Sequence, residues 1–159
     1  MLLGWLQVRR LGGQFVLRIE DIDSSRVRPG SEASILRDLA WLGFDWDEGP
    51  DVGGPHGPYR QSDCLDRYRA AVEQLRDRVF SCSCSRKEIR AAVGAQAGEI
   101  AYPGTCRDGP LHPGRALSLR FRVEPEELHW QDLETGPCSE DPSVVCGDFM
   151  LLGKDGGPV

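Results

Sequence analysis

The sequence predicts an α/β fold, and two features of its first half support this prediction. The apolar run from Phe15 to Ile19 ends in acidic residues, as expected for a buried parallel strand next to a ligand site. Apolar residues then repeat at helical spacing from Ser31, and Gly43 follows as a stop signal. Open α/β sheets place ligands at the carboxyl ends of such strands. We therefore expect an inner strand over 15–19, flanked by helices, with a cleft at its acidic end.

Local signals predict the other elements of the first half. Apolar positions among residues 2–8 suit a helix that no capping residue precedes. Residues 45–58 hold several Gly and Pro and are predicted to form a loop. Ser62 is expected to cap the next helix, whose apolar positions repeat at helical spacing. These positions are Leu65, Tyr68, Val72, Leu75 and Val79.

The second half of the sequence predicts a smaller α+β region. Ser85 and Glu88 fit a capping box at the start of a short helix. Residues 117–123 alternate between apolar and polar side chains, which is typical of a half-exposed strand. Residues 144–151 are predicted to form another strand. The predicted domains are thus 1–80, 81–147 and 148–159, the last being the start of a return to the first domain.

Charge and composition exclude some classes of protein. The 159-residue chain carries a formal charge of −6, which argues against nucleic-acid binding through a broad basic surface. Any RNA contact is therefore expected to be local. No stretch approaches the roughly 20 apolar residues of a membrane span, and the first residues do not fit a signal peptide. We predict a cytoplasmic monomer without membrane contact, whose six cysteines stay reduced and, where clustered, bind metal.

Three segments of the first half resemble the glutamyl and glutaminyl branch of class I aminoacyl-tRNA synthetases. They are residues 18–23 with Arg26, residues 41–50 and residues 57–62. The resemblance covers almost the whole chain and implies a partial Rossmann-like catalytic domain with a zinc-binding α+β insertion. It also implies that Glu20 holds the α-amino group of glutamate through a charge-assisted hydrogen bond. Spacing alone favours a plainer alternative, in which Glu20 and Asp21 are surface charges that pair with Arg18 or Arg26.

A second group of residues has the composition of a metal site. Its members are Cys82, Cys84, Tyr102 and Cys106. Three thiolates and one further oxygen or nitrogen ligand satisfy the tetrahedral preference of structural zinc. On residue types alone, ordinary burial of free cysteines is the more common explanation. The four residues resemble the zinc ligands of glutamyl-queuosine tRNA(Asp) synthetases, where tyrosine is the fourth ligand; His112 or Asp108 would be the substitute for this tyrosine.

The resemblance implies a fragment, truncated at both ends, of a glutamyl-queuosine tRNA(Asp) synthetase. Such an enzyme activates glutamate with ATP and transfers it to queuosine in the tRNA(Asp) anticodon, so glutamate, ATP and tRNA(Asp) are the implied partners and Zn²⁺ the structural cofactor. An ordinary glutamyl-tRNA synthetase and a non-catalytic zinc-binding module remain alternatives. The sequence contains neither a His-x-Gly-His-like motif nor a Lys-Met-Ser-Lys-Ser-like loop, the two ATP-binding motifs of the class. We therefore assign no catalytic residue and expect this chain alone to be inactive.

Overall fold

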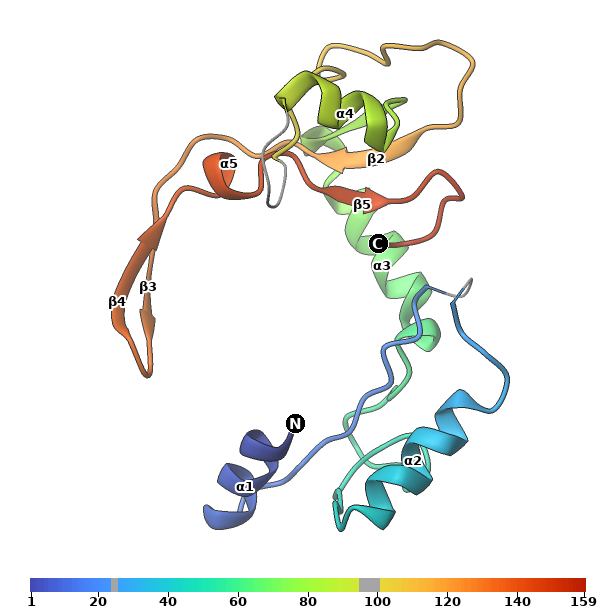
Figure 1. Cartoon of the computed structure of the whole chain (residues 1–159), viewed down its shortest axis with the longest axis vertical. Helices are drawn as coiled ribbons and strands as arrows, with labels where there is room; N and C mark the ends of the chain where they lie inside the picture. Colours follow the sequence, from blue (N-terminus) through green and yellow to red (C-terminus); the bar gives the residue numbers. More distant parts are fainter. Residues whose placement is uncertain (24–25, 95–100) are drawn as a thin grey trace. The chain divides into compact units, whose positions relative to one another are not determined.

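The computed structural model describes residues 1–23, 26–94 and 101–159. The chain divides into two compact units, Met1–Arg69 and Ala70–Val159, and each is described by itself (Figure 1). None of the helices in the described ranges is long and apolar enough to cross a membrane.

Two helices of the first unit occur where the sequence predicts them. Helix α1 covers Leu2–Arg10 and helix α2 covers Ser31–Trp41. Helix α2 ends because Gly43 adopts a left-handed conformation with φ of 85°. The Gly43 N–H then donates to the Ala40 carbonyl and the Phe44 N–H donates to the Leu39 carbonyl, which is a Schellman motif.

The predicted inner strand is only partly formed. Residues 15–19 are extended, and their backbone makes isolated parallel bridges from Val16 to Glu48 and from Ile19 to Arg60. The direction and the pairing are therefore those of a parallel sheet, but Val16 is 46 % exposed. The expectation of a fully buried strand is therefore wrong for Val16, whereas Phe15, Leu17 and Ile19 are half-buried. The partners of this segment pair with it at single points only.

The loop before α3 is held by one buried carboxylate. Glu48 is 3 % exposed and accepts hydrogen bonds from the Tyr59 hydroxyl at 2.5 Å and the His56 N–H at 3.1 Å. The 3₁₀ helix η1 (Gln61–Cys64) and helix α3 (Leu65–Gln74) follow. Ser62 lies inside η1 and does not cap α3 as predicted. Its hydroxyl and N–H instead donate to the Asp21 carboxylate, at 2.6 and 2.8 Å.

The second unit contains a three-stranded antiparallel sheet. Its strands are β1 (Val79–Cys82), β2 (Ser118–Phe121) and β5 (Met150–Leu152), in the order β1-β2-β5. The 3₁₀ helix η2 (Arg76–Arg78) precedes β1. The strand pair β3 (Leu128–Asp132) and β4 (Gly136–Glu140) forms a separate hairpin, which Figure 1 shows extending away from the sheet. Helix α4 (Arg86–Val93) begins with the predicted capping box of Ser85 and Glu88.

Two strand predictions for this unit need correction. Burial does not alternate along β2: Ser118 is 4 % exposed, Leu119, Arg120 and Phe121 are all half-buried, and the preceding Leu117 is 43 % exposed. The polar side chain faces inward because the Ser118 hydroxyl donates to the buried Cys82 carbonyl at 3.1 Å. Residues 144–151 do not form one strand. Asp141 caps a short helix α5 (Pro142–Val145), so the strand begins only at Met150.

Strands of one sheet lie on both sides of the predicted domain boundaries. Residue 80 lies within β1, and β5, which follows the predicted boundary at 148, pairs with β2. Both segments therefore belong to the same compact unit. The domain assignment 1–80, 81–147 and 148–159 stays a prediction about the family architecture.

The buried apolar cluster of the second unit is small. Its members are Phe80, Cys82, Cys84, Tyr102 and Cys106, with Ile89 of α4 packed against them. A core of this size buries little apolar surface, and small cores of this kind usually need a metal or disulfides for stability. The core of this unit and the predicted metal site are thus the same group of residues.

Candidate functional site

The two halves of the cysteine cluster come from different parts of the second unit. Cys82 is the last residue of β1, on the same face as Phe80, and Cys84 lies just before α4. Tyr102 and Cys106 lie on the segment that returns toward β2, where Tyr102 makes a parallel bridge with Gly147. Local structure therefore fixes Cys82 and Cys84, whereas long-range pairing brings the other two residues to them.

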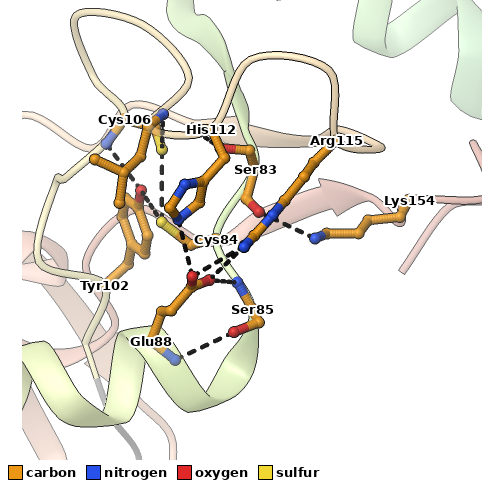
Figure 2. Close-up of polar contacts among 10 residues, drawn as sticks. Ser83, Cys84, Ser85, Glu88, Tyr102, Cys106, His112, Arg115 and Lys154 are labelled. Atoms are coloured by element: carbon orange, nitrogen blue, oxygen red, sulfur yellow. Dashed lines mark hydrogen bonds and ion pairs between the residues drawn. The ribbon is translucent and has the colours of Figure 1, made fainter.

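The structure brings all four predicted side chains together. The three cysteine sulfurs lie within 4.8 Å of one another, and those of Cys84 and Cys106 are 3.6 Å apart. The Tyr102 hydroxyl oxygen lies 3.3 Å from Cys82 Sγ and 3.8 Å from Cys84 Sγ. Figure 2 shows the Tyr102 hydroxyl, Cys84 and Cys106 in this arrangement.

These distances fit the edges of a zinc-centred tetrahedron. Zn–S bonds of about 2.3 Å place two ligand sulfurs about 3.8 Å apart, and a Zn–O bond of about 2.0 Å places oxygen about 3.5 Å from sulfur. The 3.6 Å separation of the Cys84 and Cys106 sulfurs and the oxygen–sulfur separations of 3.3 and 3.8 Å lie close to these values, and all three sulfurs lie within 4.8 Å of one another. The donor set suits zinc because thiolates are soft ligands and zinc accepts oxygen as well. The four side chains therefore have the composition and spacing of a closed structural site.

Contacts within the cluster shift the pKa values of its side chains in different directions. Burial and the neighbouring Cys106 raise the pKa of the Cys84 thiol to about 11. Burial also opposes ionisation of Cys106, but hydrogen bonds from the Tyr102 hydroxyl and the Leu111 N–H lower its pKa to about 6. Burial raises the pKa of the Tyr102 hydroxyl well above its usual value.

A buried ion pair supports the segment that carries Tyr102 and Cys106. Arg107 follows Cys106 and donates from Nε and Nη2 to both carboxylate oxygens of Asp148, at 2.7 and 2.6 Å. Asp148 is 1 % exposed and also accepts the Val123 N–H at 3.0 Å. The Arg107 guanidinium donates in addition to the Val123 carbonyl. These contacts tie the ligand segment to β2 and to the residues before β5.

A second network covers the cluster from the α4 side (Figure 2). The fully buried Ser83 accepts the His112 N–H on its hydroxyl at 2.8 Å and the Lys154 ammonium on its carbonyl at 3.1 Å. The His112 ring points to Glu88, with Nε2 2.8 Å from the carboxylate. Among the described residues neither His112 nor Asp108 joins the sulfurs, so Tyr102 is the better candidate for the fourth ligand.

Glu20 lies directly after the bridge at Ile19, at the end of the extended segment. Its side chain is 59 % exposed and lies 2.6 Å from the Arg18 guanidinium. This is the pairing of the plainer alternative. The role of Glu20 in binding the amino group of glutamate stays a prediction. Asp21 is not a free surface charge, since it is bound to Ser62.

Comparison with known protein families decides the relationship. The family model for the catalytic domain of class I tRNA synthetases (E and Q) matches residues 1–159. The chain belongs to this family. It is thus part of a family of aminoacyl-tRNA ligases that use ATP, and its two units have the α/β fold of a class I synthetase catalytic domain.

Relatives of this synthetase chain carry two different names. A glutamyl-Q tRNA(Asp) synthetase of Symbiobacterium thermophilum is 47 % identical, covering 98 % of this chain and 52 % of that protein. A glutamate–tRNA ligase of an Anaeromyxobacter species is 44 % identical, covering 99 % of this chain and 34 % of that protein. The chain therefore spans about half the length of the first relative and about a third of the second.

Solved structures agree with the family assignment. The glutamate–tRNA synthetase of Elizabethkingia anophelis superimposes on the synthetase chain with a TM-score of 0.76 at 30 % identity, covering 98 % of this chain and 35 % of that one. A glutamate tRNA ligase of Elizabethkingia meningosepticum, solved in complex with its amino acid, gives a TM-score of 0.74.

Sequence reasoning missed residues that support the cluster. The sequence marks Asp148 only as part of a predicted strand, and Arg120 only as a polar position in an alternating pattern. Asp148 is the buried partner of Arg107, and the Arg120 guanidinium lies 4.0 Å from the centre of the Tyr102 ring. An acidic residue between glycine and a strand was the only local signal for Asp148, and no local signal marks Arg120.

Proposed function

We propose that this chain is part of a glutamyl-queuosine tRNA(Asp) synthetase, which activates glutamate with ATP and transfers it to queuosine in the anticodon of tRNA(Asp). The observation that carries the proposal is the convergence of Cys82, Cys84, Tyr102 and Cys106 at tetrahedral distances. This ligand set resembles that of the queuosine-modifying branch, and a relative with that name is 47 % identical over nearly the whole chain. Ordinary glutamyl-tRNA synthetases can share the Cys-x-Cys pair and the later Tyr-x-x-x-Cys, often with a longer insert and a different fourth ligand.

In the proposed reaction the α-carboxylate of glutamate attacks the α-phosphorus of ATP, and pyrophosphate leaves. A hydroxyl of the queuosine ring then attacks the acyl carbon of the glutamyl adenylate, and AMP leaves as the proton of the hydroxyl is lost. Such steps depend on positioning and charge stabilisation more than on covalent help from the protein. The contribution of this chain is to bind and orient glutamate.

Glu20 is the residue proposed to bind the ammonium group of glutamate. Its carboxylate is accessible, and its present partner Arg18 is itself half exposed, so exchange of this exposed ion pair for the substrate ammonium group costs little. The backbone of residues 15–19 is fixed by hydrogen bonds to the Glu48 and Tyr59 carbonyls at 2.8 Å. The carboxylate therefore follows a segment whose direction is defined by its two partners.

The proposed metal is structural Zn²⁺, bound by the four residues of the cluster. Zinc in such a site joins segments and stabilises a small core, and it takes no part in the transfer of glutamate. Because the ligands must be reduced thiolates, the proposal includes a cytoplasmic location. The proposed partners are glutamate, ATP and tRNA(Asp), and the enzyme is proposed to act as a monomer.

An ordinary glutamate–tRNA ligase is the second candidate function. It is favoured by the Anaeromyxobacter relative, whose identity of 44 % is close to that of the first relative, and by the TM-score of 0.76 with a solved glutamate–tRNA synthetase. The two candidates share glutamate activation and differ in the nucleotide that receives the amino acid. A non-catalytic zinc-binding module is a third candidate, which predicts metal binding without glutamate activation.

The acceptor nucleotide is therefore the discriminating measurement. The complete reading frame that encodes this chain is expressed, and radiolabelled glutamate is supplied with ATP and either queuosine-containing tRNA(Asp) or tRNA(Glu). We expect label on tRNA(Asp), in the anticodon-loop fragment after ribonuclease digestion. Label at the 3′ end of tRNA(Glu) would identify the ordinary ligase, and zinc binding without ATP–pyrophosphate exchange would identify the binding module.

The role of Glu20 is tested in the same protein. Glu20→Ala should raise the KM for glutamate by about tenfold or more, because a charge-assisted hydrogen bond to an ammonium group is lost. Asp63→Ala is the matched control, since it removes an exposed carboxylate of the same unit that has only a 4.0 Å contact with Arg60. Equal effects of the two variants would remove the assignment of Glu20.

A further inference from the structure

Arg120 lies in the middle of β2 and turns toward the cysteine cluster. Its guanidinium carbon is 4.0 Å from the centroid of the Tyr102 ring, a short distance for a cation above an aromatic face. Its Nη1 donates to the Asp148 carbonyl at 2.7 Å. Its Nε is buried and has no hydrogen-bond partner among the described residues. The Arg120 guanidinium is therefore held by a hydrogen bond at one edge and by the aromatic ring against its face.

The strand is irregular at the position that aims this side chain. The pairing of β2 with β5 shifts register between Leu119 and Arg120. Such irregularities redirect a side chain and are common next to functional sites. The Gly147 backbone lies against Tyr102 at the same place, because a Cβ on Gly147 would be 3.1 Å from the Tyr102 nitrogen. The Tyr102 backbone is thus held close to Gly147, and Arg120 lies over the face of the Tyr102 ring.

A positive charge in this position has a specific consequence for an oxygen ligand. A phenol oxygen that binds a metal ion shares negative charge with its ring, and a guanidinium over the ring face attracts that charge. The Cys106 N–H donates to the same oxygen at 2.9 Å and holds it toward the sulfurs. Water, the ordinary competitor for a fourth position on zinc, would receive neither the ring contact nor this orientation.

We propose that Arg120 is a positioning residue of the metal centre, which makes the Tyr102 oxygen the fourth ligand in preference to water. The inference rests on the proposed metal site and goes beyond it, because it assigns the choice of the fourth ligand to a residue that binds no metal. A cation within about 6 Å of a ring centroid is attracted by the ring face, and arginine takes this place more often than lysine.

Arg122 provides a matched control on the same strand. Its guanidinium lies 5.7 Å from the centre of the Phe80 ring and donates to the Arg107 carbonyl at 2.8 Å. Phe80 belongs to the same buried cluster but offers no ligand atom. Arg122→Met therefore removes a comparable cation and its packing without touching a metal ligand.

The first test measures zinc affinity by competition with a chromophoric chelator. It compares the 159-residue chain with Arg120→Met, Tyr102→Phe, the double variant and Arg122→Met. We expect Arg120→Met to weaken zinc binding about fivefold to thirtyfold, the range for a desolvated cation–aromatic contact. In the double variant the two losses should not add, because Arg120 acts only through the tyrosine oxygen. Arg122→Met should stay within about threefold of the parent chain.

The second test reads the ligand set directly from bound Co²⁺, whose visible d–d bands respond to the coordinating atoms. Tyr102→Phe should change the band pattern, and Arg120→Met should give the same change. Circular dichroism of the metal-loaded proteins establishes that each is folded. If Arg120→Met does not fold, Arg120→Lys replaces it, and the retained charge should keep affinity within about threefold of the parent chain and preserve the band pattern.

The possible results separate the two levels of inference. A parent chain that binds no metal overturns the metal site itself and the role of Arg120 with it. Stoichiometric metal in the parent chain, with unchanged affinity and spectrum in Arg120→Met, overturns the role of Arg120 alone. Additive losses in the double variant, or a loss in Arg120→Lys as large as in Tyr102→Phe, also overturn it, because they indicate a general structural effect.

Discussion

Replacing Asp148 by Ala should strongly destabilise the second unit. The carboxylate accepts two hydrogen bonds from Arg107 and one from the Val123 N–H, at 2.7, 2.6 and 3.0 Å. Its loss leaves the buried Val123 N–H without a partner, which costs about 1–3 kcal/mol. Breaking a buried ion pair costs about 3–5 kcal/mol, and Arg107 is 33 % exposed, which favours the lower end of that range. We expect a total loss of about 3 kcal/mol, since the two effects overlap.

Thermal unfolding of the zinc-saturated chain, followed by circular dichroism, measures this effect. A loss of about 3 kcal/mol corresponds to a decrease in Tm of roughly 12–24 °C for a unit of this size. The control is Asp155→Ala, which removes an exposed carboxylate with one hydrogen bond from the Gly157 N–H and should change stability by less than about 1 kcal/mol. A change of less than about 1 kcal/mol in Asp148→Ala would refute the structural role of the ion pair.

The pH dependence of the same variant gives an independent check. Burial alone would raise the pKa of the Asp148 carboxyl, but Arg107 and the Val123 N–H outweigh burial and hold the pKa below its usual range. The unfolded pKa is about 3.9, so the stabilisation is complete above about pH 5 and is lost as pH falls through the lower, folded pKa. The difference in stability between the parent chain and Asp148→Ala should therefore be constant from about pH 5 to 8 and shrink below about pH 4. A difference that persists unchanged at about pH 2 would contradict this assignment.

Three further predictions concern the metal site, the ligand segment and activity. Cys106→Ser should lower bound zinc well below one ion per chain by mass spectrometry, because a cluster thiol is lost, whereas Cys138→Ser, outside the cluster, should not. Gly147→Ala should destabilise the chain by about 1–3 kcal/mol more than Gly156→Ala in denaturant unfolding. Both glycines have positive φ, but only the new Cβ at position 147 meets the Tyr102 backbone. Equal losses in the two variants would refute this contact. The 159-residue chain alone should show no glutamate-dependent ATP–pyrophosphate exchange above its Glu20→Ala variant, because its sequence contains neither ATP motif; clear exchange would refute this reasoning.

Local features of the chain were predictable because their causes are local. Helices α1 and α2 and the capping box of α4 follow from spacing and from side chains within a few residues of each end. The members of the cluster were also named from sequence, although the choice of Tyr102 came from a family resemblance. Residue types and spacing alone left Tyr102, His112 and Asp108 open as the fourth ligand.

Features that depend on distant partners were predicted wrongly or missed. Ser62 has the residue type of a helix cap, but Asp21 lies close enough to take both of its donors. The run over residues 15–19 has the pattern of a buried strand, yet it forms only two isolated bridges and leaves Val16 exposed, because pairing and burial depend on distant segments. Serine at position 118 and arginine at 120 have the pattern of an exposed strand face, but their buried partners come from segments far away in the sequence.

The sequence by itself determined helices α1 and α2, the capping box and the cysteines of the candidate metal site, because these depend on spacing and on neighbouring side chains. Only the tertiary structure decided that the Tyr102 oxygen, and not His112, lies among the three sulfurs, and that Arg120 covers the tyrosine ring. The physical reason is that these contacts join β1, β2 and the segment after residue 101. Their geometry follows from strand register and from the buried Arg107–Asp148 ion pair, neither of which is encoded in any single stretch of sequence.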